Sequence, residues 1–308
     1  MKKILSIAIS IIFAAQLYGQ SAQFLNISSD PAYYSLGGAT LTADANAFTI
    51  ASNASATALG AQKMSVAASY GAWQPKGMND GVLAVSGYGL LFNRLSVGLN
   101  GKYMLHKPYD IIGNDGSIKD QFTPSDMSVE LGVGYKIFRG LAIGVNLRFI
   151  SSTIYEETSG SAFGADISVS YRLKGLRLAL AATNLGSKID YGYTPYNLPA
   201  MGKLGVGYAL DINEQNTLSI HAEGDYLLYH KSFMAGAGLE YKYNDMIAAR
   251  VGYHYGDQKS IPQKSIPSYF SAGLGVKFLG ITLNGAYVIG FDNSPINGSF
   301  MASLGYEF

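Results

Sequence analysis

The fold is decided by two stretches, LAIGVNLRF at residues 141–149 and FGADISVSYRL at residues 163–173. In both, apolar side chains alternate with small, polar or charged ones, as where Ile143 and Val145 flank Gly144. Alternation with a period of two places one set of side chains on each face of an extended strand. These stretches therefore predict two-faced β-strands and an all-β fold.

Comparable segments recur along the chain from residue 63 to residue 308. They begin near Met64, Val82, Arg94, Met127, Leu141, Ala162, Leu176, Lys203, Thr217, Ser232, Met246, Tyr269, Ile281 and Ser299. The strands of a soluble β-sandwich would also alternate, so the lengths of the connections must distinguish a sandwich from a membrane barrel. Links after even-numbered strands are short, whereas most links after odd-numbered strands are long, including residues 106–125, 151–161 and 186–200. Short turns at one end and long loops at the other predict a transmembrane antiparallel β-barrel of about 14 strands in a bacterial outer membrane.

Composition agrees with this class and argues against several others. The 308 residues include no Cys and only 14% charged residues, whereas a water-soluble domain carries about 25%. The net charge is +1 and no basic stripe stands out, so nucleic acid is not expected as a partner. The four His show neither a metal-ligand spacing nor a nucleophile motif. We therefore predict no catalytic, cofactor-binding or metal-binding residues, and a protein that is not an enzyme.

The N-terminus carries a targeting signal followed by a segment of a different kind. Lys2 and Lys3 precede an apolar stretch at residues 4–15, and small or polar residues follow at Gly19 and Gln20. This layout predicts a signal peptide over residues 1–19. Residues 20–62 lack sustained alternation and are rich in Ala, Ser and Asn. We expect them to fold into the barrel lumen as a hatch.

Glycines on the lumen-facing side of the strands support an internal segment. They come as four pairs: Gly132 and Gly134, Gly205 and Gly207, Gly236 and Gly238, and Gly273 and Gly275. Glycine within a strand usually marks close approach of another backbone, or a bend. The pairs therefore make room for a plug or, alternatively, provide the curvature that closes the wall. Lumen charges of both signs can pair with each other or with the plug, and if unpaired they would line a wet channel.

The final strand runs from Phe300 to Phe308 and ends on an aromatic residue. It resembles the C-terminal signal that the barrel assembly machinery reads, with Tyr306 and Phe308 as the signal residues. The lipid bilayer and that machinery are therefore two expected partners.

The connection at residues 186–200 is the best candidate for binding a partner protein. It concentrates tyrosines and prolines, and exposed aromatic residues are common anchors of protein interfaces. The candidate residues are Tyr191, Tyr193, Tyr196, Leu198 and Pro199. The alternative is that this loop folds back and caps the barrel mouth.

Several motifs resemble a known family. They are FLNI at residues 24–27, SLGGA at residues 35–39, the passage at residues 113–126, the run at residues 143–150, and NLG at residues 184–186. Together they resemble the PorV/PorQ family of Bacteroidetes outer-membrane proteins, which are similar to the FadL long-chain fatty acid transporters. One departure is Asn53-Ala54-Ser55, where the family usually shows Asn-Pro-Ala.

The resemblance implies a role in type IX protein secretion or in cell-surface attachment of secreted cargo, with secretion-system proteins or cargo as partners. A FadL-like channel for uptake of hydrophobic small molecules is the alternative, and it would need an apolar lumen pocket. A general porin comes third and would need an unplugged lumen.

Overall fold

The computed structural model describes residues 22–308 except 114, 157, 193, 257–266 and 292–293. The predicted signal peptide, residues 1–19, lies outside the described residues. Among the helices that the structure describes, none is long and apolar enough to cross a membrane.

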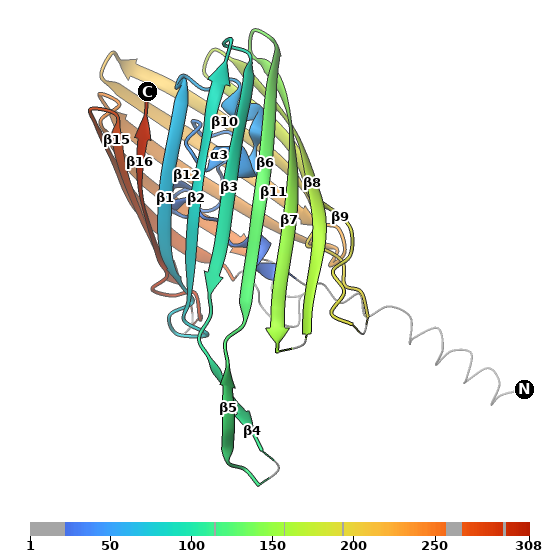
Figure 1. The fold of residues 1–308 in the computed structure, drawn as a ribbon. Coiled ribbons are helices and arrows are strands. Elements are labelled where there is room, and N and C mark those ends of the chain that lie inside the picture. The colour runs from blue at the N-terminus through green and yellow to red at the C-terminus, as the bar shows by residue number, and fades with distance from the viewer. Residues whose placement is uncertain (1–21, 114, 157, 193, 257–266, 292–293) are drawn as a thin grey trace, which may run out of the picture.

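The wall is a closed antiparallel barrel of fourteen strands (Figure 1). The strands are β1 (Met64–Trp73), β2 (Asp80–Leu91), β3 (Leu95–Leu105), β6 (Ser125–Phe138), β7 (Leu141–Tyr155), β8 (Thr158–Leu173), β9 (Leu176–Gly186), β10 (Met201–Asn213), β11 (Asn216–Leu227), β12 (Ser232–Tyr243), β13 (Ile247–Gly256), β14 (Tyr269–Phe278), β15 (Ile281–Gly290) and β16 (Phe300–Glu307). Each of these fourteen strands pairs with the next wall strand along the chain, so that β3 pairs with β6, and β16 pairs with β1 to close the ring. Closure removes the unpaired strand edges that lipid would not tolerate. The predicted fold is confirmed.

The predicted register is confirmed as well. Ile143, Val145 and Leu178 point outward and are 43%, 45% and 38% exposed, whereas Gly144 and Asn146 point inward and are buried. The same alternation continues around the wall, so that the outer surface is a belt of apolar side chains. An apolar belt on a closed barrel places the protein in an outer membrane.

The two ends of the barrel differ in the way the sequence predicts. Short turns, together with Phe308, lie at one end, which is the periplasmic end of such barrels. At the opposite, extracellular end one expectation was wrong. Residues 151–161 do not form a long loop, because β7 and β8 continue to Tyr155 and Thr158.

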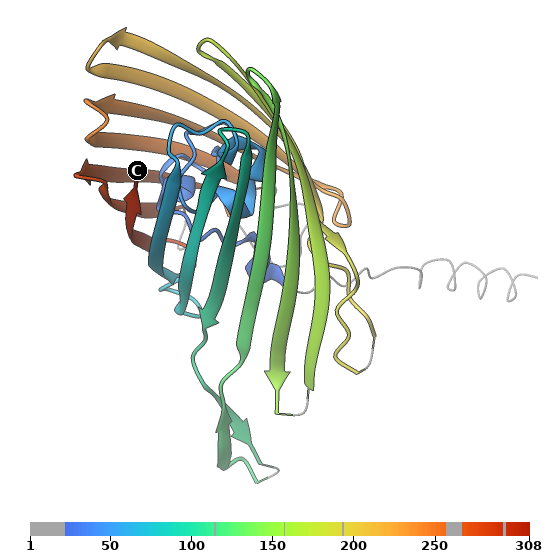
Figure 2. The ribbon, with the colours of Figure 1, turned by 45° about the horizontal axis from the view of Figure 1, so that its top comes forward.

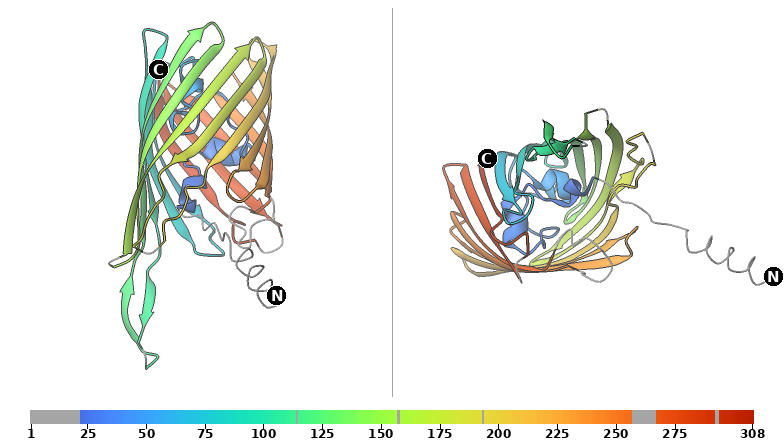
Figure 3. Two further views of the ribbon diagram at one scale, coloured as in Figure 1. Left: turned by 90° about the vertical axis from the view of Figure 1, so that its right-hand side faces the viewer. Right: turned by 90° about the horizontal axis from the view of Figure 1, so that it is seen from below.

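The connection from β3 to β6 forms a hairpin of its own. Strands β4 (Tyr109–Ile112) and β5 (Ile118–Phe122) pair with each other and project beyond the wall (Figures 1 and 3). The ring of Phe122 packs between Tyr109 and Tyr155, with centroids 5.7 Å from each. The Tyr109 hydroxyl donates a hydrogen bond to the Ile154 carbonyl at 2.8 Å. These contacts tie the base of the hairpin to β7.

Residues 22–62, called here the lumen segment, lie inside the barrel (Figures 2 and 3). The segment contains the 3₁₀-helix η1 (Gln23–Asn26) and the short helices α2 (Pro31–Ser35), α3 (Thr49–Ser52) and α4 (Ala54–Thr57). Helix α2 contacts β13–β16, whereas α4 contacts β6–β8. The segment therefore touches walls on opposite sides of the lumen.

Candidate functional site

The inward glycines make room for the lumen segment. A Cβ on Gly132 would lie 2.7 Å from the Ile50 side chain, and one on Gly238 would lie 2.7 Å from the Leu36 carbonyl oxygen. Of the eight paired glycines, only Gly275 lacks a close contact with the segment among its nearest described neighbours. Side chains at the other positions would collide with the segment, so close approach, more than curvature, explains these glycines.

The first part of the segment is shaped by a capped helix and a tight turn. The Asp30 carboxylate accepts a hydrogen bond from the Ala32 amide at 2.8 Å, and Pro31 occupies the first helical position of α2, where proline is favoured. Helix α2 ends at Ser35 and is followed by a turn at Gly37-Gly38, whose φ angles of +64° and +87° suit glycine. This turn packs directly on the backbone of β13.

Asn53 joins the later part of the segment to the wall. Its side-chain amide donates to the Leu41 carbonyl at 2.8 Å and to the Ser170 hydroxyl at 3.0 Å, and its side-chain oxygen caps α4. Ser55 bonds to Asn53 and lies 2.7 Å from Ser170, hydroxyl to hydroxyl. Ala54 is the first residue of α4, a position that also accepts proline. The departure from Asn-Pro-Ala is therefore compatible with this helix.

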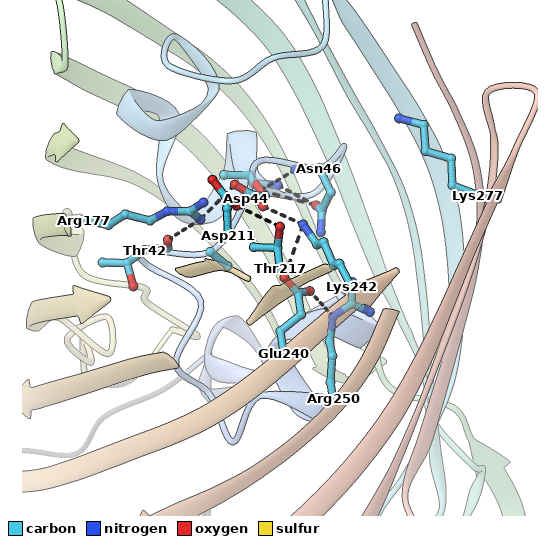
Figure 4. A network of polar contacts seen from close by, with 12 residues as sticks. Thr42, Asp44, Asn46, Arg177, Asp211, Thr217, Glu240, Lys242, Arg250 and Lys277 are labelled. Atoms are coloured by element: carbon cyan, nitrogen blue, oxygen red, sulfur yellow. Dashed lines mark hydrogen bonds and ion pairs between the residues drawn. The ribbon is translucent and has the colours of Figure 1, made fainter. Parts of the chain in front are cut away.

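Near the periplasmic end, a group of ion pairs holds the segment (Figure 4). We call it the ionic floor, and it consists of Asp44, Arg172, Arg177, Glu240, Lys242 and Arg250. Asp44 belongs to the segment, and its carboxylate lies 2.8 Å from the Arg177 guanidinium and 2.5 Å from Lys242 Nζ. The Asp44 side chain is only partly buried. Its removal from water would raise the pKa of this carboxyl, but the charges of Lys242, Arg177 and Arg172 together hold the pKa well below its usual value.

A second charged group lies farther from the periplasmic end of the lumen than the ionic floor does. It surrounds a cavity of about 110 Å³. Arg148 is buried and binds Glu130 at 2.8 Å and Asp166 at 2.9 Å, and it also donates to Asn184. Lys102 donates to three backbone carbonyls of the segment, at residues 24, 25 and 27. The sequence did not settle whether the lumen charges are paired. In the structure they are largely paired, either with one another or with the segment.

The extracellular part of the lumen is apolar. We call this cluster the apolar mouth, and its larger buried members are Phe24, Tyr34, Trp73, Val82, Met104, Ile150, Ile189, Tyr191, Leu198, Tyr269, Val288, Ile296 and Met301. Phe24 and Tyr34 come from the lumen segment, and the remaining residues come from the inward faces of strands and from loops. The sequence does not reveal this cluster, because single inward apolar residues such as Met104 and Ile150 are scattered among polar neighbours.

Most of the candidate partner-binding residues lie in or beside the apolar mouth. Tyr191, Leu198 and Pro199 are buried, Tyr196 is partly buried, and Tyr193 lies outside the described residues. The expectation that the loop is exposed was therefore wrong for Tyr191, Leu198 and Pro199. A bridge between residues 189 and 196 folds the loop back over the lumen, and the Tyr191 hydroxyl lies 2.9 Å from that of Ser152. A role in partner binding stays a prediction for these five residues.

Tyr306 and Phe308 lie on the outer surface at the periplasmic end, 44% and 58% exposed. The backbone of Phe308 exchanges hydrogen bonds of 3.0 Å with Met64, at the seam where the barrel closes. Their role as an assembly signal also stays a prediction.

These features define a class: outer-membrane β-barrels whose lumen contains the chain's own N-terminal segment. No family model and no curated protein sequence matches the chain. Among solved structures, it is similar to the toluene transporter TodX of Pseudomonas putida, with a TM-score of 0.65 and 11% identity over 91% of this chain and 98% of that chain.

Two further structures have the same fold. The toluene transporter TbuX of Ralstonia pickettii has a TM-score of 0.62 at 11% identity, and a FadL homologue of Pseudomonas aeruginosa has 0.53 at 10% identity. Both matches cover 91% of this chain and 98% of the other chain. The fold is therefore FadL-like.

Proposed function

We propose that the protein is a FadL-like channel through which small hydrophobic molecules cross the outer membrane. The apolar mouth is the observation that carries this proposal. A water-filled porin has a polar interior, whereas Met104, Ile150 and Val288 present buried apolar side chains to the lumen of this barrel. Transfer of apolar surface from water into such surroundings is favourable by about 25 cal/mol per Å². The side chains of the mouth pack against one another, so a solute passes only when they part. An apolar solute then replaces their mutual contacts, whereas a sugar or an ion would lose its hydrogen bonds to water.

The charges beneath the mouth are consistent with this selectivity. Arg148 and Lys102 are bound to carboxylates or carbonyls of the protein, so few unpaired groups are left there to attract an ion. The solved toluene transporters support the proposal through their fold, which this chain shares.

Uptake of labelled toluene tests the proposal in cells of a host strain that lacks channels of this type. Cells producing the full chain should accumulate toluene faster than cells with an empty vector, while glucose uptake should not change. Met104→Gln, which makes the mouth polar at nearly constant volume, should reduce toluene uptake. Met127→Gln is the matched control, because Met127 lies on the adjacent strand and faces outward.

Both variants should first show wild-type membrane levels and wild-type heat-modifiable migration on gels. Toluene uptake equal to that of the empty vector would contradict the proposal, and so would equal loss in both methionine variants.

A second candidate is the PorV/PorQ role in type IX secretion or cargo attachment. The projecting β4–β5 hairpin favours it, because Ile112 and Ile118 are cross-strand partners and are 58% and 62% exposed. Adjacent exposed apolar side chains on a projecting arm suit protein contact. Affinity purification from the native membrane should then recover secretion proteins or cargo. Recovery should weaken when the hairpin is shortened, or when Tyr191, Tyr193 and Tyr196 are replaced by Ser without loss of barrel heat-stability. Because Tyr191 is buried in the mouth, a loss of heat-stability in the triple variant would instead make the loop a structural cap.

A further inference from the structure

A cavity of about 350 Å³ at the periplasmic end has an unusual lining. Its charged side chains are Arg94, Lys136, Arg139 and Arg172, and Leu59 of the lumen segment closes one side. No carboxylate is among its described lining residues.

The sequence brings these four cations together through the register of the strands. Arg94 and Arg139 lie in the neighbouring periplasmic turns β2–β3 and β6–β7. Lys136 is on β6, two residues beyond Gly134 on the same inward face, and Arg172 is on the inward face of β8. The Lys136 amide donates to the Arg94 carbonyl at 2.8 Å, which fixes one turn against the other.

A neighbouring cavity of about 360 Å³ provides an internal comparison. Its lining contains four cations and four carboxylates: Arg172, Lys242, Arg250 and Lys277, with Asp44, Glu240, Asp245 and Glu307. Most of these groups form ion pairs with one another. Positive charge in that cavity is therefore balanced by the protein itself.

The cations of the first cavity are not balanced in this way. Among the described residues, Arg94, Lys136 and Arg139 form no ion pair, and Arg172 approaches Asp44 only to 4.0 Å while donating to the carbonyls of the lumen segment. Like charges gathered around one cavity repel each other, and a bound anion would relieve that repulsion.

We propose that this cavity binds a phosphate group presented from the periplasmic side. Guanidinium groups match the oxygens of phosphate with paired hydrogen bonds, and an ammonium adds a point charge. The phosphate can belong to a soluble phosphate compound or to the headgroup of an anionic phospholipid of the inner leaflet. This site is separate from the apolar mouth and does not depend on the transport proposal.

The first arm of the test uses the full chain purified in detergent, with inorganic pyrophosphate as the probe. Calorimetric titration at low salt should show saturable binding that weakens as NaCl is added. The double variant Arg94→Gln/Arg139→Gln should bind at least tenfold more weakly. Lys174→Gln is the matched control, because Lys174 is an exposed cation of the next periplasmic turn and does not line the cavity.

The second arm identifies the source of the phosphate. The chain is reconstituted in nanodiscs of phosphatidylethanolamine with or without phosphatidylglycerol, and retained lipid is measured by native mass spectrometry. Specific retention of phosphatidylglycerol that the double variant loses supports a lipid source, and pyrophosphate binding alone supports a soluble source. The proposal is wrong if neither probe binds saturably, or if Lys174→Gln weakens binding as much as the double variant does.

Discussion

The lumen segment is held at its two ends by different forces. At the extracellular end, Phe24 and Tyr34 are buried in the apolar mouth, 4% and 3% exposed. At the periplasmic end, Asp44 is held by cations of the ionic floor, although its side chain is 40% exposed. Apolar burial changes little with salt or moderate pH, whereas exposed ion pairs are screened by salt and lost on protonation. The two attachments should therefore fail under different conditions.

The mouth should contribute the larger part of stability. Ile150→Ala leaves a cavity at a fully buried position, and we expect it to lower the free energy of unfolding by about 2–4 kcal/mol, independently of salt. Equilibrium unfolding in urea with lipid vesicles measures this change. Leu147→Ala is the control on the same strand, because Leu147 faces lipid and is 59% exposed. An equal loss in the two variants would mean that the mouth is not a packed core.

The rim of the mouth should respond to alkaline pH. His106 lies 2.9 Å from Asp126 and 3.2 Å from Asp80. Hydrogen bonds to Asp126 and then Asp80 raise the pKa of His106 to about 9. Because the pKa is raised on folding, this stabilisation is complete below about pH 6.5 and is lost as the pH rises through about 9.

His106→Gln should therefore lower stability by about 1 kcal/mol at pH 6, after allowance for solvent screening. Thermal unfolding at several pH values measures this, and the difference from the unsubstituted chain should vanish above pH 10. A difference that does not change with pH would exclude the ion pairs as its cause.

The ionic floor should give the smallest effect and the one most dependent on salt. Asp44→Asn removes the charge but keeps the shape, and we expect a loss of about 0.5–1 kcal/mol at low salt that disappears at high salt. Thermal unfolding at two NaCl concentrations measures it. Asp211→Asn provides a control, since the Asp211 carboxylate accepts a hydrogen bond from the Thr217 hydroxyl at 2.9 Å and forms no ion pair in the described part of the chain.

The stability that the ionic floor contributes should be lost in acid, whereas the stability that the rim contributes is lost in alkali. The pKa of Asp44 is depressed on folding, so its stabilisation is present above the unfolded-state value of about 3.9 and is lost as the pH falls below it. The Asp44→Asn difference should persist from pH 7 to about pH 4. An Asp44→Asn difference that already fades between pH 7 and pH 5 would contradict this assignment.

The wall was predictable from the sequence because its signal is local. Ile143, Gly144 and Val145 alternate with a period of two, and that period fixes both the strand and the direction of each side chain. The final strand, at residues 300–308, shows the same pattern and closes the barrel as expected.

The lumen contents were less predictable because their contacts join residues far apart in sequence. The inward glycines indicated that something packs against the wall, but nothing in the sequence paired Asp44 with Lys242 or placed Phe24 and Ile150 in one apolar cluster. The loop holding Tyr191 looked like an exposed aromatic surface, since its return over the lumen depends on Ile189 finding a buried place in the mouth.

A cross-link between the lumen segment and the wall tests the central claim most directly, because the chain contains no native cysteine. Ser55 in the segment and Ser170 on β8 have hydroxyls 2.7 Å apart. Ser55→Cys/Ser170→Cys should therefore form a disulfide on mild oxidation of outer membranes, whereas Ser55→Cys/Ser303→Cys, with Ser303 on β16, should not. Protection of both thiols from a maleimide reagent in the first pair alone would support a segment seated in the lumen. Two freely reactive thiols and no cross-link in a folded barrel would contradict it.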